Sequence, residues 1–130
     1  MTVDNNQAFA IAFLIFLLIT HGISSYEKVF DFKGTLAWMK THFAQSILKD
    51  IVPLALTILV FMEVATTGMS AYALYELLTN ENIEWVHFAN IFNLISLFLM
   101  LIAQRLARDF DGARTIVIYL IPSFLVLLFL

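Results

Sequence analysis

Four long runs of apolar residues dominate the sequence and limit the folds that are open to the chain. They cover about residues 8–23, 51–75, 86–107 and 115–130, and a helix needs roughly 17–25 residues to cross a bilayer. Lipid offers the backbone no hydrogen-bond partners, so uninterrupted apolar runs of this length favour helices, which bond internally. The sequence therefore predicts an all-α membrane protein, a bundle of four transmembrane helices.

Composition supports a lipid environment and removes several classes of protein. The chain is 62% hydrophobic and 13% charged, where a soluble domain averages about 45–50% and about 25%. The absence of cysteine excludes disulfides, thiolate metal sites, iron–sulfur clusters and covalent haem attachment. A net charge of −3 gives no reason to expect nucleic acid as a partner. We expect no metal site. We also expect no cleaved signal peptide, since no basic residue precedes the first apolar run.

The charged residues are sorted between the two ends of the predicted spans. All seven basic residues fall after the first span or around the connection of the third and fourth: Lys28, Lys33, Lys40, Lys49, Arg105, Arg108 and Arg114. The charged residues before the first span and around the connection of the second and third spans are all acidic: Asp4, Glu76, Glu81 and Glu84. Basic connections face the cytoplasm, so we expect four crossings of a bacterial inner membrane with both termini periplasmic.

The long first connection predicts a further helix at the inner interface, over residues 35–49. Its apolar stripe would consist of Leu36, Met39, Phe43 and Ile47. Asp50 and Pro53 then predict the start of the second span, with Asp50 as the N-cap. No repeat or linker divides residues 1–130, so we expect a single membrane domain.

Glu63 is the most unusual residue, because it lies about twelve residues into the second run, or roughly 18 Å along a helix. Removal from water favours the protonated carboxyl unless a cation or several donors lie close. We expect it to join an intramembrane polar network with Thr67, Ser70, Asn93, Ser96 and Ser123. Two interpretations stay open: a protonated donor that fixes helix packing, and a carboxyl that handles protons.

A second group of polar residues gathers at the predicted cytoplasmic boundary. It comprises His21, Glu27, Lys28, Trp38, Gln104, Arg105, Arg108, Asp109 and Tyr119. A quinone needs an apolar channel for its tail and donors at its carbonyl groups, so this is a candidate quinone or lipid headgroup site. The alternative is simple anchoring, since basic and aromatic residues commonly border the bilayer. A haem is disfavoured, because only His21 and His42 could share a side.

The sequence also resembles the DoxX-like family of small four-helix membrane proteins. The resemblance is carried by His21-Gly22, Glu27-Lys28, Gly34 through Trp38, Pro53, Glu63 and the segment 104–113. Where the family has a glutamate followed by paired glycines, this chain has Glu63 with only Gly68. The resemblance marks His21, Gly22, Lys28, Glu63 and Gly112, and it implies an association with quinone-linked redox systems.

No complete catalytic constellation is present, so we expect no catalysis by the chain alone. The favoured interpretation is a cofactor-free accessory subunit of a quinone-linked respiratory or redox complex, with a larger membrane complex or further copies of itself as partners. One alternative is a subunit that binds quinone directly and takes part in its oxidation or reduction. A small proton-coupled transporter is a weaker one, because four spans without repeats make a poor alternating-access device.

Overall fold

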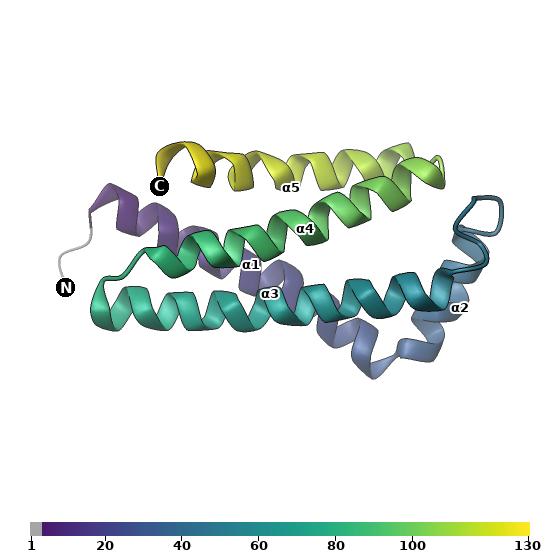
Figure 1. Ribbon diagram of the computed structural model, residues 1–130, viewed down its shortest axis with the longest axis horizontal. Coiled ribbons are helices and arrows are strands. Elements are labelled where there is room, and N and C mark those ends of the chain that lie inside the picture. Colours follow the sequence, from purple (N-terminus) through teal and green to yellow (C-terminus); the bar gives the residue numbers. More distant parts are fainter. Residues whose placement is uncertain (1–3) are drawn as a thin grey trace.

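The computed structural model describes residues 4–130, and over that range the chain is all-helical, without strands. Over these residues five helices follow one another: α1 (Asn5–Phe30), α2 (Phe32–His42), α3 (Val52–Asn80), α4 (Glu84–Leu106) and α5 (Phe110–Phe129). Figure 1 shows their arrangement. The helices α1, α3, α4 and α5 are long and apolar enough to cross a membrane. The predicted all-α fold with four apolar helices is therefore confirmed.

The long helices lie side by side in chain order, with α1 along α3, α3 along α4 and α4 along α5. Figure 1 shows the start of α1, the α3–α4 connection and the C-terminus at one end of the bundle. The short α2 and the α4–α5 connection lie at the other end. All seven basic residues belong to segments at that second end, which we call the basic end.

Local hydrogen bonds and backbone geometry set the helix ends. Asp4 caps α1 by accepting from the Gln7 backbone N–H at 2.7 Å, while the Gln7 side chain accepts from the Asp4 N–H at 3.2 Å. Two residues adopt left-handed backbone angles where helices end, Glu81 after α3 (φ 54°) and Arg108 after α4 (φ 61°). These turns allow the short connections that make neighbouring helices antiparallel.

The predicted interfacial helix over 35–49 is wrong in its bounds. The helix begins at Phe32 and ends at His42, and turns follow it as far as the start of α3. The Ser46 hydroxyl accepts from the Leu48 backbone N–H and donates to the Phe43 carbonyl, so side-chain bonds replace helical ones. Ile47 consequently leaves the predicted stripe and is 78% exposed.

Other predicted boundaries also shift. α1 continues beyond residue 23 to Phe30, α3 beyond residue 75 to Asn80, and α5 begins at Phe110 instead of residue 115. Polar residues end an apolar run without ending a helix, which explains the extra turns. Asp50 does not cap α3, because the N-cap position is Ile51 and no side chain bonds the free N–H groups there. Pro53 does stand in the first turn.

Two apolar clusters fill different parts of the bundle. At the end opposite the basic end, α1, α3 and α4 bury Leu14, Leu17, Leu77 and Ala89 in a continuous core. At the basic end, Met39 and Phe43 from the α2 segment pack on Val52 and Leu56 of α3. The short α2 thus covers the first turns of α3.

Truncation of Leu77 should destabilise the bundle, because its side chain is fully buried while that of the adjacent Leu78 is 50% exposed. We expect Leu77→Ala to lower the free energy of unfolding by about 2–5 kcal/mol, the usual range for a buried leucine. Leu78→Ala is the matched control and should change it little. Denaturant unfolding in detergent measures both, and equal effects would contradict this packing.

Candidate functional site

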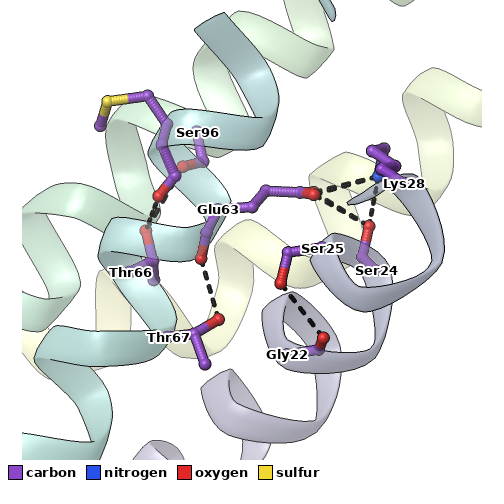
Figure 2. Close-up of polar contacts among 9 residues, drawn as sticks. Gly22, Ser24, Ser25, Lys28, Glu63, Thr66, Thr67 and Ser96 are labelled. Carbon is purple, nitrogen blue, oxygen red and sulfur yellow. Dashed lines mark hydrogen bonds and ion pairs between the residues drawn. The ribbon is translucent and has the colours of Figure 1, made fainter. Parts of the chain in front are cut away.

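A buried ion pair joins α1 to α3. The Lys28 ammonium lies 3.1 Å from Oε2 and 3.4 Å from Oε1 of Glu63, and Figure 2 shows these contacts as dashed lines. The Ser24 hydroxyl donates to the same carboxylate at 3.0 and 3.1 Å and accepts from Lys28. Glu63 is 2% exposed at its side chain and Lys28 is 19% exposed. The carboxylate therefore lies inside the protein, and the lysine reaches it from the surface side.

Helical spacing places these groups together. His21, Ser24 and Lys28 are three and four residues apart, so they lie along one face of α1. Glu63, Thr66 and Ser70 form the corresponding buried face of α3. Both faces turn inward, where the polar side chains find hydrogen-bond partners on neighbouring helices.

The partners of Glu63 differ from those that the sequence predicted. Among the described residues its carboxylate bonds Ser24 and Lys28 on α1, whereas Asn93, Ser96 and Ser123 of the predicted network bond elsewhere. The reason is geometric, since α3 packs on both α1 and α4 and the side chain turns to α1. The nearest charged partner of Glu63 is thus the Lys28 ammonium at 3.1 Å, and the contact joins α3 to α1.

A second polar group connects α1, α4 and α5 through amides. His21 Nε2 lies 2.8 Å from Asn93 Oδ1, and the Asn93 amide donates to Ser123 Oγ at 2.7 Å and to Asn90 Oδ1 at 3.1 Å. Asn90 in turn donates to the Ser123 carbonyl at 3.0 Å. Because both amide protons of Asn93 are engaged, its oxygen must accept, so His21 Nε2 carries the proton that it donates.

The remaining predicted network residues make mainly local contacts. Thr67 donates to the Glu63 carbonyl at 2.8 Å, and Ser96 approaches Thr66 Oγ1 at 3.4 Å (Figure 2). Ser70 is fully buried, and its hydroxyl has no hydrogen-bond partner among residues 4–130. The predicted single network therefore consists of separate groups: the Glu63 pair, the Asn93–Ser123 group, and the Thr66–Ser96 contact.

At the basic end, His42 of α2 holds the α4–α5 turn. Its Nε2 lies 3.1 Å from Gln104 Oε1 and 3.3 Å from Asp109 Oδ2, and the Trp38 ring stacks on the imidazole at 4.7 Å. Asp109 also caps α5 by accepting from the Gly112 N–H at 2.9 Å. We call this arrangement the His42 clasp; it fastens α2 to the end of α4 and the start of α5.

The structure separates the other members of the predicted boundary cluster. His21 belongs to the buried amide group, and Tyr119 packs edge-on against Phe16 at 5.8 Å. Arg105 lies over the Phe110 ring at 4.7 Å, and Arg108 occupies the turn after α4. Glu27 makes no side-chain hydrogen bond or ion pair in the described structure. Only Lys28, Trp38 and Gln104 of the nine line a common cavity.

That cavity lies between α2, α3 and α4 near the basic end and has a volume of about 390 Å³. Its walls are mainly apolar, with Met39 and Phe43 on one side, Ile58 on α3 and Ile102 on α4. Its polar side chains are Lys28, Thr35, Trp38 and Gln104. The volume falls within the range of about 300–1,000 Å³ that is typical of small-molecule sites. We call it the α2 pocket.

Sequence reasoning missed several residues that the structure makes important. Ser24 is not among the predicted site residues, although it stands four residues before Lys28 on the face of α1 that carries His21. Asn90 is not among the predicted network residues, although it stands three residues before Asn93 on α4. Regular spacing along a single helix could have indicated both. The pairing of His42 with Gln104 and Asp109 had no such signal, because it joins segments about sixty residues apart.

A double-mutant cycle tests the ion pair. Lys28→Met or Glu63→Gln alone leaves an unpaired polar or charged group, so each should cost about 3–5 kcal/mol of stability. The double variant should be more stable than either single one, because the unpaired charge disappears. Unfolding in detergent measures the four proteins, with the exposed Lys33→Met as the control. Additive effects of the two substitutions would contradict a direct pair.

The His42 clasp depends on close approach at Gly112. A β-carbon there would lie 2.6 Å from Asp109 Oδ2 and 2.7 Å from Gln104 Nε2. We expect Gly112→Ala to cost about 1–3 kcal/mol through overpacking. Gly68→Ala is the control, because nothing lies within 4 Å of its added carbon. Thermal unfolding compares the two variants, and a neutral Gly112→Ala would contradict this geometry.

Comparisons with known proteins leave the site to be interpreted from its own geometry. The chain matches no protein-family model, no curated protein and no solved structure. Within residues 4–130, no group of three or more histidine, aspartate or glutamate side chains could hold a metal ion. The candidate sites are therefore the Lys28–Glu63 ion pair, the amide group around Asn93 and the α2 pocket.

Proposed function

We propose that the chain is an integral protein of a bacterial inner membrane, crossing it four times with both termini on the periplasmic side. Four sufficiently long apolar helices support the crossings. Large apolar side chains such as Ile19, Phe61 and Leu128 point away from the bundle, where lipid would cover them. The basic end supports the orientation, because lysine and arginine accumulate on the cytoplasmic side.

Within that membrane, we propose that the chain is a cofactor-free accessory subunit of a quinone-linked redox complex and that a quinone enters its α2 pocket. The pocket carries this proposal. It offers apolar walls for a hydrocarbon tail and ring, and Lys28 supplies an N–H donor for a carbonyl oxygen. In this proposal electron transfer belongs to the partner subunits.

The distribution of polar groups favours this role over transport. The buried polar side chains occupy the middle of the bundle and the part toward the basic end. Toward the opposite end the core consists of apolar residues such as Ala10, Leu14, Ala73 and Val86. A proton or ion crossing the bundle would meet this apolar layer, which offers it no ligand. A site that is reached from one side suits binding better.

The experiment combines partner recovery with protection of the pocket. A tagged chain is purified from its native membranes in mild detergent, where we expect stoichiometric recovery of redox subunits. Because the chain contains no cysteine, Thr35→Cys provides a single maleimide target at the pocket wall. A quinone analogue should slow its labelling and should leave Thr79→Cys, near the other end of α3, unaffected.

Each arm of the experiment can contradict part of the proposal. Recovery of the chain alone would refute the accessory role. Equal labelling of Thr35→Cys with and without the analogue would refute quinone binding in the α2 pocket. Turnover of a quinone by the isolated chain with a soluble electron donor would favour the rival interpretation, a subunit that is itself an oxidoreductase.

A further inference from the structure

The α2 pocket contains a single cationic side chain and no acidic one. Lys28 is the residue of α1 that reaches the pocket wall, and its partner Glu63 is not among the lining residues. Of the ion pair, only the lysine therefore belongs to the pocket wall. A ligand in the pocket can contact the lysine, whereas the carboxylate lies outside the wall.

The longest hydrogen bond of Lys28 is the one that a ligand can replace. A lysine ammonium has three N–H groups. They are directed to Ser24 Oγ, to Glu63 Oε2 at 3.1 Å and to Glu63 Oε1 at 3.4 Å. The positive charge is thus already compensated, and a carbonyl oxygen can take the place of Oε1 while Oε2 keeps the ion pair. Thr35 adds a hydroxyl to the pocket wall.

We propose that the α2 pocket selects amphiphiles with a neutral carbonyl headgroup over anionic ones, and that Glu63 sets this selectivity as a positioning residue. This inference rests on the proposed role of the pocket as a site for a membrane-dissolved ligand. A neutral carbonyl accepts the Lys28 N–H that makes the long contact with Glu63 Oε1, and it brings no charge into the apolar walls. Glu63 touches no ligand; it holds Lys28 in place and cancels its charge.

An anionic headgroup would be the poorer occupant for an electrostatic reason. A carboxylate or phosphate loses most of its hydration in an apolar pocket, at a cost of several kcal/mol. Its attraction to Lys28 is opposed by repulsion from Glu63, whose carboxylate lies just beyond the ammonium. To form a full ion pair, the ligand would have to displace Glu63 and leave that buried carboxylate without its cation.

Simple probes of equal chain length test the selectivity. They are a long-chain methyl ketone, the corresponding fatty acid at a pH where it is ionised, and the corresponding alkane. Binding to the purified full chain in detergent micelles is followed by Trp38 fluorescence in a Trp85→Phe background, which leaves one tryptophan, at the pocket wall. We expect the ketone to bind about tenfold more tightly than either other probe, as one hydrogen bond to a charged donor allows.

Two variants separate the roles of donor and counter-charge. Lys28→Met should abolish the difference between ketone and alkane, because it removes the donor and keeps an apolar side chain. Glu63→Gln should shift the preference toward the fatty acid by about tenfold or more, since Lys28 becomes an uncompensated cation. If either single variant fails to fold, the more stable double variant Lys28→Met/Glu63→Gln also lacks the donor and should bind ketone and alkane equally, and the three probes on the unchanged chain still decide.

The inference is overturned if the fatty acid binds the unchanged chain as tightly as the ketone, if ketone and alkane bind equally, or if Lys28→Met leaves their difference intact. A folded Glu63→Gln protein with unaltered selectivity would likewise show that Glu63 does not set the headgroup preference. These outcomes differ from failure of the accessory role. A chain that prefers the ketone but recovers no redox partner keeps the headgroup selectivity and loses the proposed complex.

Discussion

The ion pair between Lys28 and Glu63 sets the register of α1 against α3, and the layout of the basic end follows from it. Lys28 stands in the last turn of α1, whereas Glu63 is the twelfth residue of α3. About eleven residues of α3, or roughly 16 Å of helix, therefore extend past this contact without α1 beside them. The short α2 packs there, and the space that it leaves unfilled is the α2 pocket.

The bundle is divided along its length into a polar part and an apolar part. The buried amides, hydroxyls and the ion pair occupy the middle and the region toward the basic end, and leucine and alanine fill the remainder. In a bilayer, such an arrangement keeps most of the costly polar groups paired inside the bundle. His21 Nδ1 and the Ser70 hydroxyl are buried atoms that lack a partner among the described residues. This distribution of polar groups links the fold to the proposed role, because it provides a binding site at one end of the bundle without a continuous polar route through it.

The sequence allowed the helices to be predicted, but not the contacts between them. The length and apolarity of the four runs were sufficient for the long helices, and the 3.6-residue period was sufficient to turn Glu63 inward. Which neighbour Glu63 meets depends on the axial register of α1 against α3, and a periodic pattern within one helix carries no information about that register. The pairing of Glu63 with α1, instead of α4 or α5, could not be predicted for this reason.

Local bonding caused the errors in the first connection. The Ser46 hydroxyl ends the regular structure after His42, and the backbone turns that follow carry Ile47 away from the stripe to which its spacing assigned it. The His42 clasp was beyond sequence reasoning, because it closes only when α2 and the α4–α5 turn have already been brought together.

The amide group around Asn93 has a consequence for how the last helix finds its place. Hydrocarbon surrounds a membrane helix whether or not it has joined its neighbours, so burial of leucine and isoleucine discriminates weakly between docked and separate states. Asn90 and Asn93 reach the carbonyl and hydroxyl of one residue, Ser123, and they can do so in a single rotational setting of α5. The two asparagines thus determine the rotational setting in which the C-terminal helix docks against α4.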